Sequence, residues 1–417
     1  MQSKLLINIK QLVNTSSGHE PLYGKEMTSL PCIENAWLLI EGNEIAAFGK
    51  MASLNKEIPS LPEQQIDCSG RFVLPSWCDS HSHIVFAGSR ENEFVDKIKG
   101  VSYAEINARG GGILNTVQLT NEISEDELFR ISWKRLDEIK KLGTGAIEIK
   151  SGYGLTLEGE LKMLRVIKKL KEKSGLLIKS TFLGAHTYPS IFRDDHSGYL
   201  NELVNVMLPV IAKEKLADFI DVFCENGFFS AEESEFILRA GMQYGLKPKM
   251  HVNQLNSIGG IAIGIKIKAL SLDHLETMQE KDFIELENSG WQGICTLLPT
   301  AAFFLRLPFP SARRLVESGL AIALASDYNP GSSPSGNMNL VIAMACIQMK
   351  LLPEEALNAA TINGAFAMGL GHSVGTISVG KIANLIISSP VPSLAYLPYS
   401  FGNGHIDKII VQGDTVV

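Results

Sequence analysis

The sequence predicts an α/β fold, a (β/α)8 TIM barrel joined to a small β-sandwich domain that both chain termini build. Eight short apolar runs, each ended by a polar or turn residue, follow one another between about residues 75 and 330 of the 417-residue chain. Helix-like segments lie between several runs, and eight β-α units over about 250 residues are the usual size of such a barrel. Strand-like runs near both termini predict the second domain.

The eight predicted barrel strands are rich in β-branched and other apolar residues. They cover residues 77–83, 145–150, 176–186, 219–225, 246–252, 271–275, 294–299 and 321–327. The clearest helix lies between the second and third strands, where apolar residues recur at helical spacing over residues 157–167. Thr156 is expected to cap the start of this helix, and Gly175 is expected to end it.

Strand patterns at the two chain ends predict the smaller domain. They cover residues 5–13, 37–49, 72–74, 375–389 and 406–417, with turn signals at Gly42-Asn43 and Gly413-Asp414. The expected bounds are 1–73 with 374–417 for the β-sandwich domain and 74–373 for the barrel. A long insertion over residues 84–144, which contains the motif ARGGGI, is expected to cover the mouth of the barrel.

The composition favours a small-molecule partner. Lys and Arg number 38 against 45 Asp and Glu, a formal net charge of -7, which gives no electrostatic reason to bind nucleic acid or an anionic membrane. The six cysteines form no C-x-x-C pair, which argues against a disulfide framework and favours the cytoplasm. Neither a signal-peptide pattern nor an apolar run of about 20 residues predicts secretion or a membrane span.

Ionisable residues gather at the ends of the predicted strands. In chain order these ends carry His83, Lys150, His186, Glu225, His251, His274, Pro299 and Asp327. The carboxyl ends of barrel strands meet at one face, where the chemistry of such barrels sits. Strand ends chosen only for turn formation would favour Asn, Ser and Gly over four histidines, so the pattern indicates an active site.

His81-Ser82-His83 is the sharpest local feature, because the period of two in a strand points both imidazoles to one face. An H-x-H pair alone is a weak signal. Together with His251 and Asp327 it predicts a site for one Zn2+ or Fe3+ ion per subunit, with a position left for water. Such an ion lowers the pKa of bound water to roughly 7, which favours hydrolysis.

The fourth strand bears on the number of metal ions. It ends in Cys224-Glu225 and offers no lysine there that could bridge two metal ions. This favours a single ion. Lys150 lies two strands earlier and is interpreted as a supporting residue.

Several longer motifs agree with these assignments. They are DSHSHIVFAGSRENEF, EIKSGYGL, TFLGAHTYP, DVFCENGFF, KMHVNQL, SLDHLE, ASDYNPGSSP and GKIANLII. On these residues the chain resembles the amidohydrolase superfamily and, within it, the imidazolonepropionase family. The resemblance implies opening of 4-imidazolone-5-propanoate to N-formimidoyl-L-glutamate in histidine degradation. The chain departs from the family in two places: His-Ser-His replaces the usual His-Thr-His, and Gln254 stands where some relatives carry an acid.

The resemblance also implies roles for individual residues. The metal ligands would be His81, His83, His251 and Asp327. Their chemistry makes Asp327, His274 and His186 the candidate catalytic residues: Asp327 to carry a proton, and the two histidines to polarise the carbonyl or shuttle a proton. The substrate contacts would be Arg90, Tyr153, His186, Gln254, Asn329, Gly331 and Ser332. Elementary chemistry agrees for Arg90, because a propionate tail suits a planar donor that is always charged.

Two alternatives remain at this stage. A heterocycle aminohydrolase, such as a guanine or cytosine deaminase, would use the same barrel and metal on a substrate without a carboxylate tail. A non-catalytic assembly protein would have lost the metal. For the imidazolonepropionase function the expected partner is an anionic small-molecule substrate, and a homodimer is a family-level expectation.

Overall fold

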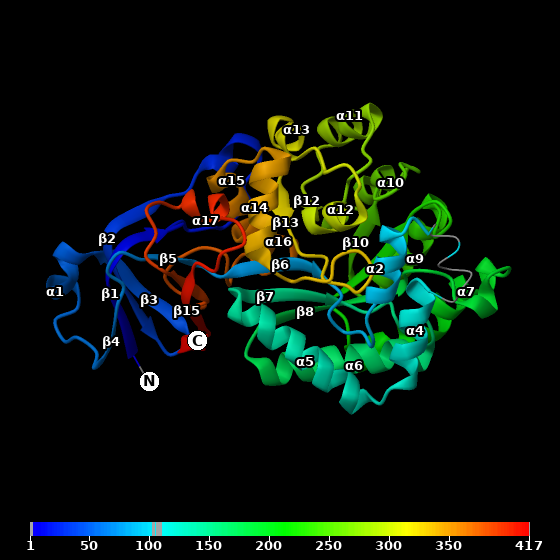
Figure 1. The fold of residues 1–417 in the computed structure, drawn as a ribbon, viewed down its shortest axis with the longest axis horizontal. Helices are drawn as coiled ribbons and strands as arrows, with labels where there is room; N and C mark the ends of the chain where they lie inside the picture. Colours follow the sequence, from blue (N-terminus) through cyan, green and yellow to red (C-terminus); the bar gives the residue numbers. More distant parts are fainter. Residues whose placement is uncertain (1–2, 102–104, 106–110, 417) are drawn as a thin grey trace.

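The computed structural model describes residues 3–101, 105 and 111–416, and its centre is a parallel sheet of eight strands (Figure 1). The strands are consecutive in space, in the order β13-β12-β11-β10-β9-β8-β7-β6. Their bounds are β6 Trp77–Ser82, β7 Thr144–Lys150, β8 Leu177–Ala185, β9 Phe219–Cys224, β10 Lys247–Val252, β11 Ser271–His274, β12 Ile294–Leu297 and β13 Ile322–Leu324. The predicted barrel is therefore confirmed.

The barrel closes through residues that lie just beyond the short strand β13. Asp327 N–H donates to His81 O at 2.9 Å, and His83 N–H donates to Tyr328 O at 2.9 Å. The buried Asp79 carboxylate adds two bonds across the same seam, from Ser326 N–H at 3.0 Å and from the Ser326 hydroxyl at 2.6 Å. Closure thus places the residues after β13 directly beside β6.

Several predicted strands run past the observed ones. The strand predicted over 321–327 ends at Leu324, and Pro299 is the first residue of a helix and not the end of a strand. Proline at the first helical position loses no backbone hydrogen bond, because that N–H has no partner inside the helix. The polar residues at the strand ends therefore belong largely to the loops that leave the barrel.

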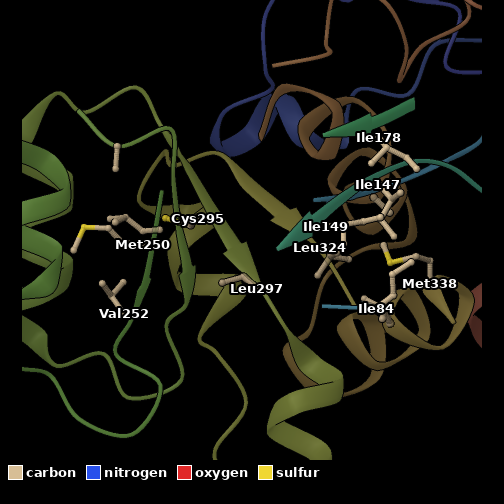
Figure 2. Packing of buried hydrophobic residues seen from close by; sticks show 14 of the residues in the cluster. Ile84, Ile147, Ile149, Ile178, Met250, Val252, Cys295, Leu297, Leu324 and Met338 are labelled. Carbon is tan, nitrogen blue, oxygen red and sulfur yellow. The ribbon is translucent and has the colours of Figure 1, made fainter. Parts of the chain in front are cut away.

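The barrel strands alternate charged and apolar residues. Ile147 and Ile149 of β7, and Met250 and Val252 of β10, belong to the main hydrophobic cluster between strands and helices (Figure 2). The residues between them, among which is Glu148, point to the other side, because side chains alternate along a strand. The interior of this barrel is therefore polar, whereas branched apolar residues usually fill it.

Helices cover the outside of the barrel, both between successive strands and after β13. Their bounds are α5 Glu125–Lys141, α6 Leu157–Ser174, α7 His196–Asn201, α8 Leu208–Glu214, α9 Ala231–Gln243, α10 Gly260–Lys266, α11 Glu280–Ser289, α12 Pro299–Leu305, α13 Ala312–Glu317, α14 Met338–Met349, α15 Pro353–Ala360 and α16 Ile362–Ala367. The predicted caps of α6 are confirmed: the Thr156 side chain accepts from Gly159 N–H, and Gly175 adopts a left-handed conformation with φ 74°. None of the helices described has an apolar stretch long enough to cross a bilayer.

The insertion between β6 and β7 carries further helices. Residues Glu91–Ile98 form α2 and Ile113–Glu122 form α4, and both precede α5. Part of the ARGGGI motif lies outside the described residues. Phe94, Ile98 and Ile113 line the cavity at the barrel mouth, so the insertion forms part of its wall.

Strands from both chain ends form a second sheet, at the left of Figure 1. Its order is β16-β15-β14-β5-β1-β2-β3, with β4 beside β1. The bounds are β1 Ser3–Val13, β2 Cys32–Glu41, β3 Glu44–Lys50, β4 Gln64–Asp67, β5 Phe72–Pro75, β14 Leu385–Ser388, β15 Ile406–Val411 and β16 Asp414–Thr415. The short helices α1 (Leu54–Glu57) and α17 (Tyr396–Tyr399) lie in the same parts of the chain.

The two chain ends share one hydrophobic core. Leu6 and Leu38 from the amino-terminal strands belong to the same buried cluster as Leu385 and Ile410 from the carboxy-terminal strands. The antiparallel pair of β5 and β14 joins the two halves. The predicted domain from both termini is confirmed, whereas its residue bounds stay a prediction.

Lys381 ties the chain ends to the barrel by a buried ammonium group. Its Nζ donates to Gly371 O at 2.7 Å, to Gly18 O at 3.2 Å and to Val374 O at 3.4 Å. Burial lowers the pKa of Lys381 to about 8. Two carbonyls near Lys381 in sequence and one from the amino-terminal segment thus share one donor.

Replacing Lys381 by Met is expected to lower the free energy of unfolding by about 1–3 kcal/mol, because buried carbonyls lose their donor. Between pH 8 and the usual lysine pKa of 10.5 the unfolded chain binds more protons than the folded one. The wild-type protein should therefore gain stability relative to Lys381→Met as pH rises from 8 to 10. Urea unfolding at several pH values measures both effects, with the exposed Lys56→Met as control. A stability difference that shrinks with rising pH contradicts this expectation.

Candidate metal centre and active site

Three predicted ligands meet where the barrel closes. His81 is the fifth residue of β6, and His83 directly follows this strand. The His81 and His83 Nε2 atoms lie 3.2 Å apart, and Asp327 Oδ1 lies 3.5 Å from each of them. Nitrogen and oxygen donors are thus held around one small volume.

Strands β10 and β11 bring two more imidazoles to the same place. The ring centroid of His251 lies 4.4 Å from that of His81 and 5.3 Å from that of His274. Within the described residues, two overlapping groups have ligand atoms within 4.8 Å of one another: His81 with His83 and Asp327, and His81 with His251 and His274. The two groups contain the whole predicted ligand set, and they add His274.

Buried carboxylates orient two of these histidines. His81 Nδ1 lies 2.7 Å from Asp273 Oδ2, and His251 Nδ1 lies 3.0 Å from Asp221 Oδ2. A ring nitrogen beside a carboxylate carries the hydrogen, so the lone pair of each ring is on Nε2 and free to bind a metal. Such carboxylate-histidine pairs are typical of metal sites.

The donor set fits a metal ion. Burial and the neighbouring Lys150 lower the pKa of His81, and burial and the neighbouring His186 lower that of His83, so both rings are neutral. In the part of the chain that the structure describes, the buried Nε2 of His251 has no hydrogen-bond partner. Neutral imidazoles with a carboxylate suit a transition-metal ion, which would also separate nitrogen lone pairs that otherwise repel.

A network of buried charges lies beneath these ligands, inside the barrel. Lys150 Nζ donates to Glu148 Oε1 at 2.6 Å and to Asp221 Oδ2 at 2.7 Å, and it lies 3.6 Å from Asp273 Oδ2. Lys249 Nζ contacts the other Glu148 oxygen and lies 4.0 Å from the same Asp273 atom. All five side chains are fully buried. The expected supporting role of Lys150 agrees with this position, below the ligands and outside the cavity.

A cavity of about 550 Å³ opens beside the candidate ligands His83, His251 and Asp327. Every predicted substrate-contact residue lines it; these are Arg90, Tyr153, His186, Gln254, Asn329, Gly331 and Ser332. Apolar side chains from α2 and α12 form part of the wall, and the Phe94 and Phe304 rings stack across it at 5.4 Å. Lys97 and Arg306 add positive charge to the lining.

The Arg90 guanidinium group has one nitrogen bonded to the protein and another without a partner among the described residues. Its Nε donates to Thr116 Oγ1 of α4 at 3.0 Å, whereas its buried Nη2 has no partner among the residues described. A side chain at Gly331 would place a Cβ atom 2.3 Å from Arg90 Nη1, so this glycine makes room for the guanidinium group. An unpartnered guanidinium nitrogen in a cavity is a site for an anionic group.

The loop after β13 orients Asp327. Asn329 Oδ1 accepts from Gly331 N–H and Ser332 N–H, each at 2.8 Å, and Asn329 Nδ2 donates to Asp327 O at 2.7 Å. The Ser332 hydroxyl donates to Asp327 Oδ2 at 3.0 Å, which leaves Oδ1 facing His81 and His83. Asn329 and Ser332 therefore position the carboxylate in addition to lining the cavity.

The surroundings of two further histidines shift their pKa values in opposite directions. Burial, aided by the neighbouring His251, lowers the pKa of His186 to about 3, and its Nδ1 lies 3.0 Å from Gly152 O. Because a carbonyl only accepts, Nδ1 carries the hydrogen and Nε2 is an acceptor. Burial lowers the pKa of His274, but the Glu276 carboxylate, 3.2 Å from Nδ1, outweighs it and raises the net pKa. His274 is thus the better hydrogen-bond donor.

Sequence reasoning missed the supporting carboxylates and one lysine. They are Glu148, Glu160, Asp221, Lys249, Asp273 and Glu276. A usable signal was present, because Glu148 stands two residues before Lys150 and Lys249 two residues before His251. A charged residue two positions before a strand-end site residue shares its face of the strand.

Comparisons with known proteins agree with this geometry. The model of the amidohydrolase family matches residues 226–416. An imidazolonepropionase from Flavobacterium johnsoniae is 53% identical over 99% of this chain and 99% of its own length. An imidazolonepropionase from Thermoanaerobacter pseudethanolicus is 40% identical over 100% of this chain and 99% of its own.

Solved structures share the fold at low sequence identity. The guanine deaminase of E. coli superposes with a TM-score of 0.74 at 14% identity, covering 100% of this chain and 99% of that one. A mutant atrazine chlorohydrolase from Arthrobacter aurescens, complexed with zinc and atraton, gives 0.73 at 15% identity, covering 99% and 95%. At such identities the likeness shows the barrel architecture alone.

Replacing Asp221 or Asp273 by Asn is expected to weaken metal binding about 10–100-fold, because the ligand histidines lose the groups that orient them. Competition with a chromophoric chelator measures the affinity. Asp218→Asn is the control, since Asp218 lies three residues earlier and pairs with Lys179 at 2.9 Å, away from the histidines. Wild-type affinity in both variants would rule out this supporting role.

Proposed function

The chain belongs to the imidazolonepropionase family of the amidohydrolases, and we propose that it hydrolyses the cyclic amide C–N bond of 4-imidazolone-5-propanoate to N-formimidoyl-L-glutamate. One observation of the structure carries the proposal. A single cavity holds a metal-binding cluster and, on the same lining, an arginine with an unpartnered nitrogen. This arrangement suits a ring to be hydrolysed that bears an anionic tail.

One metal ion per subunit is part of the proposal, held by His81, His83, His251 and Asp327. When bound, the ion would supply Lewis-acid activation of the substrate carbonyl and of a water whose pKa falls to roughly 7. Zinc and ferric iron both suit these nitrogen and oxygen donors. The structurally similar atrazine chlorohydrolase is complexed with zinc, which supports zinc as the first ion to test.

Asp327 is the proposed proton carrier. In the reaction the water oxygen bonds to the ring carbonyl carbon, the C–N bond breaks, and a water proton reaches the departing ring nitrogen. Asp327 Oδ1 faces the ligand histidines while Ser332 holds Oδ2, so the carboxylate can take the proton without rotating. Burial raises the pKa of Asp327, despite the opposing effect of His274, and this makes the transfer to the carboxylate easier.

The remaining polar groups bind the substrate. His274, backed by Glu276, is the proposed donor to the oxyanion that develops on the carbonyl. His186 presents Nε2 as an acceptor for a ring N–H, and Arg90 binds the propionate. Tyr153 and Gln254 line the same cavity and complete the substrate contacts.

A heterocycle deaminase is the alternative function. The fold of the E. coli guanine deaminase supports the shared scaffold, but 14% identity carries no argument about substrate. Guanine and cytosine have no carboxylate, so they would leave Arg90 Nη2 without a partner in the cavity. The non-catalytic alternative has less support, because the described residues include a complete donor set.

Further proposals concern partners and location. The proposed partner is an anionic small molecule, with neither nucleic acid nor membrane expected, and the proposed assembly is a homodimer. All six cysteines are free, which agrees with a reducing cytoplasm.

The function is tested by following the ultraviolet absorbance of imidazolone propionate with purified protein. We expect the protein to consume imidazolone propionate, a chelator to abolish this turnover and added metal to restore it. Guanine and cytosine should stay unchanged in parallel assays. Deamination of a nucleobase without loss of the imidazolone would overturn the proposed function.

Asp327→Asn is expected to lower kcat by about 10²–10⁴-fold, because the amide cannot carry the proton. Circular dichroism and thermal unfolding serve as controls that the fold is retained. Retention of more than a few per cent of kcat would sink the assignment of Asp327.

Arg90→Met is expected to reduce kcat/KM about 10–100-fold, which corresponds to the loss of hydrogen bonds to a charged group. As a control, kcat/KM of wild type and Arg90→Met is also compared on the methyl ester of the substrate. Wild type and variant should converge on the ester, since its tail carries no charge. An equal loss on acid and ester contradicts binding of the carboxylate by Arg90.

A further inference from the structure

Glu160, a fully buried residue in the first turn of α6, has no role in the mechanism above. Its Oε1 accepts from Gly154 N–H at 2.8 Å and Leu155 N–H at 2.9 Å. Gly152 N–H lies 3.2 Å from both carboxylate oxygens. Successive backbone N–H groups that converge on one anion form a nest, and here the anion is a side chain of the same protein.

This carboxylate does not serve as an ordinary helix cap. Thr156 already caps α6 through Gly159 N–H at 3.1 Å. Glu160 follows Gly159, and its side chain reaches back to donors that precede the cap. The bonds therefore hold the loop over residues 152–155 and not the helix end.

The glycines of this loop permit the close contact with α6. A Cβ atom at Gly154 would lie 2.3 Å from Glu160 N, and Gly152 adopts φ 102°, which other residues rarely do. Leu155 is also left-handed, with φ 55°. Such a backbone is strained unless its surroundings determine it, and the three bonds to Glu160 do so.

The loop carries one side chain of the cavity and orients a second one. Tyr153, between the two glycines, lines the cavity with its ring centroid 5.2 Å from that of His186. Gly152 O accepts the Nδ1–H of His186 at 3.0 Å, and this bond sets the tautomer that turns Nε2 into an acceptor. Asn121 of α4 holds a second carbonyl of the loop, through a bond from Nδ2 to Gly154 O at 2.9 Å.

We propose that Glu160 is a positioning residue for the reaction: its carboxylate fixes the loop so that Tyr153 and the His186 acceptor are both preset for the substrate ring. The inference rests on the proposed function. Glu160 touches neither the substrate cavity nor the metal ligands, and it acts through the backbone of residues 152–155.

The test compares Glu160→Gln with Glu158→Gln, a matched change at an exposed position of the same helical turn. In Glu160→Gln the charge is lost and the amide group faces Gly152 N–H. We expect kcat/KM on imidazolone propionate to fall at least tenfold, with bound metal unchanged, and Glu158→Gln to equal wild type. Glu160→Asp, which keeps the charge on a shorter side chain, should lie between them.

A double-mutant cycle separates positioning from a general loss of stability. The effect of Glu160→Gln should shrink severalfold in a Tyr153→Phe background and stay at full size in an Arg90→Met background. Hydrogen exchange of the residue 152–155 amides, which needs no substrate, should accelerate in Glu160→Gln and not in Glu158→Gln.

The outcomes are distinguishable. An inactive wild type overturns the proposed function, whatever Glu160 does. An active wild type with equally active Glu160→Gln, unchanged exchange of these amides, or equal effects in both double-mutant backgrounds would each overturn the positioning role.

Discussion

The active site depends on charges buried inside the barrel. Glu148, Asp221 and Asp273 share the ammonium groups of Lys150 and Lys249, all fully buried. A buried charge that loses its partner costs several kcal/mol, so these groups constrain one another. Three carboxylates against two ammonium groups leave one negative charge, which a bound cation would offset. Asp273 and Asp221 also orient His81 and His251. The same carboxylates therefore balance the buried charges and set the geometry of the histidines.

Closure of the barrel is the second constraint. His81 and Asp327 come from the two ends of the barrel segment, and the backbone bond from Asp327 N–H to His81 O joins them. Asp79 strengthens the seam through Ser326. Any distortion of this seam would move the carboxylate relative to the histidines, because both sit within a few residues of it. The metal centre therefore depends on the integrity of the whole barrel.

Small residues and buried polar groups then shape the cavity above the metal. Gly331 leaves space for the Arg90 guanidinium, and the glycines around Tyr153 let their loop approach α6. In each case a glycine without a side chain leaves the space that a cavity residue, Arg90 or Tyr153, needs. Preorganisation of this kind reduces the entropy lost when the substrate binds, which is how rigid sites gain affinity and rate.

The sequence by itself determined the order of eight strands, the domain from both termini and the residues at the strand ends, because periodicity and turn chemistry are local. The family resemblance also predicted Arg90 as a cavity residue, and the structure places it in the cavity lining. The tertiary structure decided which carboxylates support the histidines: Asp273 is remote in sequence from His81 and Asp221 from His251, and only the packing of the barrel strands brings each pair within bonding distance. Likewise, Glu160 reads as an ordinary helix residue until the fold places three backbone donors around its carboxylate.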